Sequence, residues 1–183
     1  MTPAPTVVIA ALPDTGLEAV ALRSVLEAAG RTVGLHFIAT PDHFRQLIAA
    51  QPVPDLLAIC GHGADGGLHF GALAEEAGGH ELANGFLMPE RFAGQVALPG
   101  CIVLCTACDS ASAALAQAFL QGGARAYIAP EGEPDGGDML LAAHLVLHGL
   151  FRGLDPPAAV AAANAAVGRS LSLALAPGVA HAA

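Results

Sequence analysis

Short apolar runs alternate along this chain with longer stretches whose apolar residues recur at helical spacing. Apolar runs bounded by turn residues are typical of buried strands. Five such runs are Thr6 to Leu12, Thr32 to Ala39, Leu56 to Cys60, Ile102 to Thr106 and Ala126 to Ala129. The helical pattern covers about 15–29, 40–48, 110–121, 138–152 and 156–172. This alternation predicts one α/β domain, with a mostly parallel sheet and helices on both faces.

Local signals support the ends of these elements. Thr15 and Glu18 have the spacing of a capping box, and Gly30 stands where a helix C-terminal cap is expected. The last seven residues, 177–183, show no pattern and are expected to form a loose tail after a domain of residues 1–176.

The stretch from Ala64 to Gly100 is less regular, because glycine turns divide it into short segments. It predicts a small hairpin and a short helix near Pro89 to Phe92. It separates the third and fourth predicted strands. Two interpretations stay open: a segment that contacts a substrate, or an ordinary surface connection.

Composition narrows the class of protein. The chain has 183 residues, of which 54% are hydrophobic and 13% charged, which excludes a disordered chain and favours self-association as a homo-oligomer. The net charge is −9, and the seven basic residues are all arginine with no basic run. Nucleic acid and anionic membranes are therefore not expected as partners.

The expected compartment is the cytoplasm. No apolar stretch approaches the roughly 20 residues that a membrane span needs, and the N-terminal apolar run resembles a strand more than a signal peptide. Four cysteines, three of them in or beside strand-like runs, do not resemble a secreted disulfide framework.

Two of the predicted strands end at reactive residues. The run LLAICGHG ends in His62-Gly63, and CIVLCTAC ends in Cys108. Parallel strands deliver functional residues at their carboxyl ends, so an imidazole and a thiol could meet there. A cysteine nucleophile needs a proton carrier and donors for an oxyanion. His62 would carry the proton, and the backbone N–H groups of Gly63 and Cys108 would hold the oxyanion.

The reactivity of Cys108 is open to two opposing influences. A helix is predicted to follow it, and the partial positive charge of a helix N-terminus lowers a thiol pKa. Asp109 is adjacent in the sequence and opposes formation of the thiolate. A cysteine at a strand end is also common as a small buried hydrophobe, and His-Gly is common in turns.

No metal site and no cofactor are expected. His144 and His148 have a spacing that can bind zinc, but the sequence HLVLH lacks the glutamate of a zinc protease, and no third ligand is evident. Cys105 and Cys108 would point to opposite faces of a strand. The glycine-rich GHGADGG lacks the Lys-Ser/Thr of a phosphate-binding loop.

The blocks LLAICGHG and CIVLCTACDS resemble those of the caspase-like cysteine peptidases of clan CD, which include caspases, clostripain, gingipain and separase. The chain is most similar to the bacterial CHAT domains. ANGFLMPERFAG, ALAQAFLQGGARAYIAP and HLVLHGLFRGLDPPAAVAAAN extend the likeness over most of Asp55 to Asn164. The resemblance implies a caspase-like architecture, with His62 as the catalytic histidine, Cys108 as the nucleophile and Gly63 in the oxyanion hole. It implies a protein or peptide substrate.

Many members of this family prefer a charged side chain beside the scissile bond. By the resemblance, the pocket for that side chain opens after the fifth strand, where the chain carries Glu131, Glu133, Asp135 and Asp138. An acidic pocket would favour arginine or lysine, with Asp138 as the first candidate. The alternatives are a solvated acidic loop and, for Asp138, a helix N-cap. CHAT domains usually finish with an aromatic-rich strand, which is not predicted here.

The function predicted from the sequence is a cysteine endopeptidase. The main alternative is a catalytically silent caspase-like domain that binds a protein partner or oligomerises. A third is a flavodoxin-like domain that binds a small molecule and shares only the βα alternation.

Overall fold

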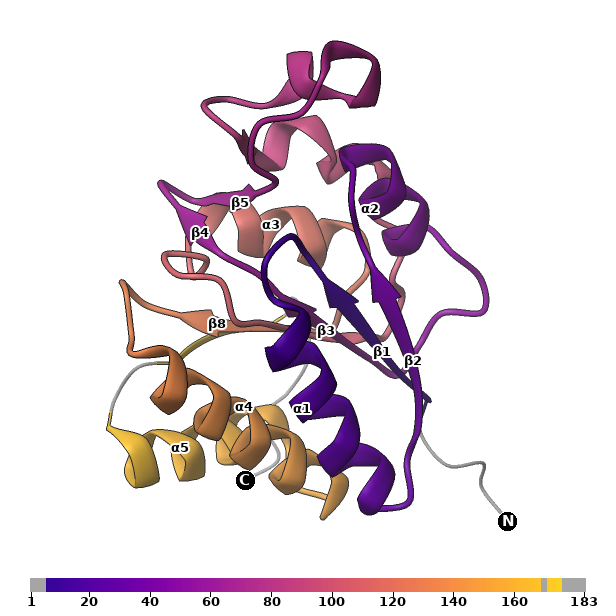
Figure 1. Cartoon of the computed structure of the whole chain (residues 1–183). Helices are drawn as coiled ribbons and strands as arrows, with labels where there is room; N and C mark the ends of the chain where they lie inside the picture. The colour runs from indigo at the N-terminus through magenta and orange to yellow at the C-terminus, as the bar shows by residue number, and fades with distance from the viewer. Residues whose placement is uncertain (1–5, 169–170, 176–183) are drawn as a thin grey trace.

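A six-stranded sheet forms the centre of the computed structural model, which describes residues 6–168 and 171–175 (Figure 1). The strands are ordered β2-β1-β3-β7-β8-β9. Their bounds are β1 (Thr6–Ala11), β2 (Thr32–Phe37), β3 (Leu56–Cys60), β7 (Ile102–Cys105), β8 (Ala126–Pro130) and β9 (Leu171–Leu175). All neighbouring pairs are parallel except β8 and β9. The predicted mostly parallel α/β sheet is confirmed.

Helices cover both faces of the sheet, as predicted (Figure 1). Their bounds are α1 (Gly16–Ala28), α2 (Pro41–Ile48), α3 (Ala113–Gln121), α4 (Gly136–Phe151) and α5 (Pro156–Val167). Side chains alternate across a strand, so Val7 and Ile9 join the core under α1, α4 and α5, whereas Ala10 joins the core under α2 and α3. None of the helices in the described residues is long and apolar enough to cross a bilayer.

The segment between β3 and β7 folds against the α2 and α3 side of the sheet. It contains a small antiparallel sheet of β4 (Gly63–Ala64), β5 (Gly67–His69) and β6 (Phe86–Leu87), followed by short 3₁₀ turns that include Pro89–Arg91. The predicted hairpin and short helical turn are confirmed. Leu68, Phe70 and Leu87 belong to the same buried cluster as Phe44 of α2, so this segment is an integral part of the core.

The sheet has a final strand that the sequence did not predict. The expected last helix, over 156–172, ends at Val167, and β9 then pairs with β8. The Asn164 side chain exchanges two hydrogen bonds with the backbone of Leu171, at 2.9 and 3.0 Å, and so ties the end of α5 to this strand. An apolar run such as LSLAL suits a helix or a strand, and the free edge of β8 selects the strand. The expected tail, 177–183, lies outside the described residues.

Two helix starts differ from the prediction. α3 begins at Ala113 rather than near Ser110, because the Ser112 hydroxyl accepts a hydrogen bond from the Leu115 N–H at 3.3 Å and caps the helix. Thr15 is the N-cap of α1 but makes no capping hydrogen bond. Its hydroxyl is 2.8 Å from the Leu12 carbonyl oxygen and 3.0 Å from that of Cys60, so the predicted capping box is wrong.

Candidate active site

His62 and Cys108 follow the carboxyl ends of two neighbouring parallel strands, β3 and β7. β3 and β7 are parallel, and Ile59 is opposite Cys105. The pairing continues past the strand ends, because the Thr106 N–H donates to the Ile59 carbonyl at 2.9 Å. His62 and Cys108 each follow three residues after the pair Ile59–Cys105, so both leave the same edge of the sheet side by side. His62 is exposed and Cys108 is half-buried.

The backbone of Gly63 lies directly against the Cys108 segment. A Cβ atom at position 63 would collide with the Cys108 carbonyl oxygen and would lie 3.1 Å from the Cβ of Ala107. Only glycine leaves room for this approach. The two loops that carry the imidazole and the thiol are therefore in van der Waals contact.

Two hydrogen bonds from other parts of the chain hold the turn after Cys108. Tyr127, buried in β8, donates its hydroxyl proton to the Ser110 carbonyl at 2.9 Å. Asp109 has a φ of 53°, and its N–H donates to the Gly132 carbonyl at 2.8 Å. The turn that follows the Cys108 thiol is thus hydrogen-bonded to β8 and to the loop after β8.

The local environment raises the pKa of the Cys108 thiol. Burial is the largest cause, followed by the negative charges of Glu133 and Asp109 and, more weakly, of Glu18. The predicted lowering by a helix N-terminus is wrong, because α3 begins five residues later, at Ala113. The opposing effect predicted for Asp109 is confirmed. The thiol is therefore protonated at neutral pH, and a base has to remove its proton before it can attack.

Glu18 is a residue of this region that the sequence analysis assigned only to a helix cap. It lies in the first turn of α1, and its carboxyl group faces the Thr106 hydroxyl and the Cys60 thiol, with His62 close enough to interact by charge. Burial raises the pKa of Glu18, and its Oε1 atom has no hydrogen-bond partner among the described residues. Glu18 could have been recognised from its position in the sequence. It lies in the first turn of the helix that follows β1, and this turn lies at the same edge of the sheet as His62.

The acidic residues after β8 divide into two groups. Glu131 lines a cavity of ≈ 320 Å³ together with Asp109 and Ser112, and Glu133 acts on the pKa of Cys108. The loop that carries both is attached to the nucleophile turn, since the Ala111 N–H donates to the Pro130 carbonyl at 3.1 Å. These two glutamates therefore lie on the Cys108 side of the site.

Asp135 and Asp138 belong to the start of α4 instead. Asp135 is the N-cap, and its side chain accepts hydrogen bonds from the N–H groups of Gly137 at 2.8 Å and Asp138 at 3.4 Å. The N-cap role considered for Asp138 is therefore filled by Asp135. Asp138 is exposed in the first helical turn. Its role in specificity stays a prediction.

The remaining cysteines are core residues. Cys60, Cys101 and Cys105 are buried and unpaired, and burial raises the pKa of each thiol, that of Cys101 to about 12. The predicted core positions of Cys60 and Cys105 are confirmed. Within the described residues, no group of three or more His, Cys, Asp or Glu side chains could hold a metal ion.

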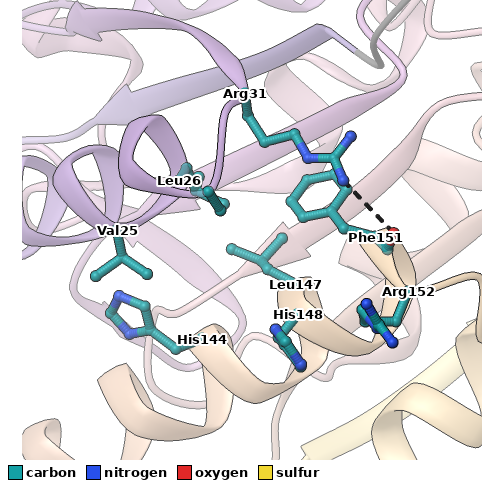
Figure 2. Close-up of a pocket in the computed structure, with 9 residues that line it drawn as sticks. Val25, Leu26, Arg31, His144, Leu147, His148, Phe151 and Arg152 are labelled. Atoms are coloured by element: carbon teal, nitrogen blue, oxygen red, sulfur yellow. Dashed lines mark hydrogen bonds between the residues drawn. The ribbon is translucent and has the colours of Figure 1, made fainter.

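His144 and His148, the pair with zinc spacing, line a separate cavity of ≈ 260 Å³ at the far end of α1 and α4 (Figure 2). The His144 Nδ1 atom lies 2.7 Å from the Leu140 carbonyl, within the same helix. Arg31 stacks on the Phe151 ring at 4.4 Å and reaches the carbonyl of that residue (Figure 2). Arg31 therefore links the segment after α1 to the end of α4.

Comparison with known proteins rests on structure alone. No family model and no curated protein matches the sequence. Two crystal structures of the separase–securin complex of Saccharomyces cerevisiae are similar to this chain, with TM-scores of 0.60 and 0.56 at 11% and 10% identity. Both superpositions cover 96% of this chain. The chain has a caspase-like α/β fold. It spans only 12% and 13% of the chains that it matches, so the similarity concerns one domain of a much longer protein.

Proposed function

We propose that this domain is a cysteine endopeptidase of the caspase-like clan, closest to the bacterial CHAT domains, that acts on a protein or peptide substrate in the cytoplasm. The observation that carries the proposal is that His62 and Cys108 each follow, by three residues, one member of the pair Ile59–Cys105 on the neighbouring parallel strands β3 and β7. The unpaired cysteines of the described residues suit a reducing compartment.

The proposed reaction begins with transfer of the Cys108 proton to His62. The thiolate then attacks the carbonyl carbon of the scissile bond, and the oxyanion accepts hydrogen bonds from the backbone N–H groups of Gly63 and Cys108. His62 returns the proton to the leaving amine as the C–N bond breaks. Water, deprotonated by His62, attacks the acyl-enzyme, and the carboxylic acid product leaves as Cys108 regains its proton.

The acidic loop after β8 is proposed to select a basic side chain before the scissile bond. Glu131 and Glu133 are its best-placed members, because they lie on the side of the site where Cys108 holds the acyl group. A guanidinium or ammonium group would be attracted to this loop. Asp135 and Asp138 would add to the negative potential from the start of α4.

The alternative function is a catalytically silent domain that binds a protein or self-associates. The observation in its favour is the raised pKa of the Cys108 thiol. After burial, the negative charges of Glu133, Asp109 and Glu18 contribute to this rise. The similar yeast structures contain separase together with securin, a protein partner. Under this alternative, we propose that the domain of this chain binds a protein partner as well.

Covalent labelling separates the two functions. We expect a peptidyl-arginine chloromethyl ketone to label the folded protein at Cys108, as read by mass spectrometry of peptides. Cys108→Ala should abolish the labelling, and Cys105→Ala should retain it, with circular dichroism to confirm that both variants fold. Equal labelling of the two variants, or no labelling of the folded wild type, would contradict the peptidase.

A further inference from the structure

We propose that an apolar cavity at the carboxyl ends of β1 and β2 binds the substrate side chain that follows the scissile bond, and that this side chain is large and apolar. The inference rests on the peptidase function and adds the substrate preference on its leaving-group side. The cavity measures ≈ 500 Å³. Its lining is mostly apolar and includes Leu12, Phe37, Phe70 and Leu73, and Asp14 is the one charged residue that the lining contains.

The cavity has an exposed aromatic wall. Phe37, at the end of β2, keeps 60% of its surface exposed, and its ring lies 3.5 Å from where a Cβ of Gly16 would stand, at the first residue of α1. Most of this ring is therefore open to solvent. An exposed large apolar surface beside a candidate catalytic group is typical of a binding surface.

Two of the residues that line the cavity, Leu12 and Phe70, lie next to the segment that carries His62. On one side, the Leu12 N–H donates to the Cys60 carbonyl at 2.9 Å, and a Cβ on Gly61 would lie 2.9 Å from the Leu12 Cδ1 atom. On the other side, Phe70 follows His69, whose N–H donates to the His62 carbonyl at 2.9 Å. Two walls of the cavity therefore flank the point at which His62 leaves β3.

The chemistry of the reaction sets the direction in which a substrate lies. The sulfur of Cys108 bonds to the carbonyl carbon and retains the acyl part, whereas His62 protonates the nitrogen of the departing part. In the strand order β2-β1-β3-β7-β8-β9, the His62 side faces β1 and β2, and the Cys108 side faces β8. The departing segment thus begins beside the apolar cavity.

The two sides of the site consequently differ in the side chains they suit. The Cys108 side carries the acidic loop with Glu131 and Glu133, and the His62 side carries the apolar walls. Burial of a leucine-sized side chain contributes favourable binding free energy. A substrate with leucine at this position should therefore have a kcat/KM about tenfold or more above that of a substrate with glycine. The preferred cleavage site is therefore a basic residue followed by a large apolar one.

The test compares internally quenched peptides that differ only in the residue after the scissile arginine: leucine, phenylalanine, glycine or aspartate. The wild type should cleave the leucine and phenylalanine peptides about tenfold faster than the glycine peptide. Phe37→Ser, at an exposed position, should bring this ratio close to one. The matched control is Leu141→Ser on α4, which is 51% exposed and should leave the ratio unchanged.

The peptidyl-arginine chloromethyl ketone provides the second measurement, because its leaving group is chloride and does not reach the cavity. Its labelling rate should be the same in the wild type and Leu141→Ser, and in Phe37→Ser it measures how far the reactivity of Cys108 itself has changed. If labelling proceeds but the leucine-to-glycine ratio is near one, or survives Phe37→Ser, the apolar subsite is wrong and the peptidase stands. If the folded wild type neither reacts nor cleaves, both proposals fail.

Discussion

The backbone of Gly63 and the carbonyl group of Cys108 approach so closely that position 63 has no room for a side chain. This contact joins the loop that follows β3 to the loop that follows β7. It therefore fixes the position of the loop that carries His62 relative to the loop that carries Cys108.

Gly63→Ala should separate these two loops. Its methyl group would meet the Cys108 carbonyl oxygen, and overpacking of this kind costs about 1–3 kcal/mol. We expect a lower free energy of unfolding in urea and at least tenfold slower labelling of Cys108. The control is Gly94→Ala, since a Cβ at position 94 meets nothing within 4 Å. A Gly63→Ala protein with unchanged stability and labelling would show that the loops are not in contact.

The alkylation rate of Cys108 should depend on the carboxylates around it. Burial and the charges of Glu133 and Asp109 raise the pKa of its thiol, so the rate of reaction with iodoacetamide should reach half its maximum at a higher pH than for a free cysteine. Asp109→Asn and Glu133→Gln each remove a negative charge that destabilises the thiolate. Each should move the midpoint to lower pH, measured by mass spectrometry on the Cys108 peptide. An unchanged midpoint in both variants would exclude the charge effect.

Glu18 should make the stability of the protein depend on pH. Burial raises its pKa above the ordinary value of 4.5, so the folded state holds this proton more tightly than the unfolded state. Its contribution to the free energy of unfolding is complete below pH 4.5 and is lost as the pH rises through the folded-state pKa. Glu18→Gln keeps the shape of the side chain without the ionisation.

Urea denaturation between pH 4 and 8 measures this effect. The wild type should lose stability relative to Glu18→Gln as the pH rises, with the change confined to the window above 4.5. Glu27→Gln is a suitable control, because Glu27 is an exposed residue of the same helix. Parallel pH profiles for the wild type and Glu18→Gln would show that the Glu18 carboxyl is solvated.

Glu131 should contribute to selection of a basic side chain. Glu131→Gln is expected to lower the ratio of labelling rates between arginine and norleucine chloromethyl ketones by about fivefold to tenfold, in line with loss of one partly desolvated charge pair. The ratio cancels any change in the reactivity of Cys108. An unaltered ratio would assign this loop to the solvated surface.

Asp135 provides the contrast within the same acidic segment. Asp135→Ala removes the N-cap of α4, which should cost about 1 kcal/mol of stability. It should leave the arginine-to-norleucine ratio within twofold of the wild type, because the side chain is engaged with the helix N-terminus. A large fall in that ratio would instead place Asp135 in the specificity pocket.

Much of the fold follows from signals that are local in the chain. Strands such as β3 are buried on both faces, so their residues form uninterrupted apolar runs that can be recognised without knowing their neighbours. The parallel arrangement follows from the alternation with helices. The candidate dyad could be predicted for the same reason, because His62 and Cys108 each interrupt an apolar run at its end.

Other features depend on contacts between distant segments and left no local signal. The run Leu171–Leu175 became a strand only because β8 offered a free edge, and Thr15 turned away from its capping position toward the carbonyl of Cys60. Glu18 reached the His62 region for the same reason. The cavity beside Phe37 exists only once β1, β2 and the segment after β3 are assembled.

The amino-acid sequence thus identified His62 and Cys108 as candidates for chemistry, since strand ends and turns are encoded in neighbouring residues. Tertiary packing established the environment of those residues: a raised pKa at Cys108, a largely buried carboxyl group at Glu18, and acidic side chains on the side of β8. Burial and electrostatic effects sum over all atoms nearby in space, whatever their separation along the chain.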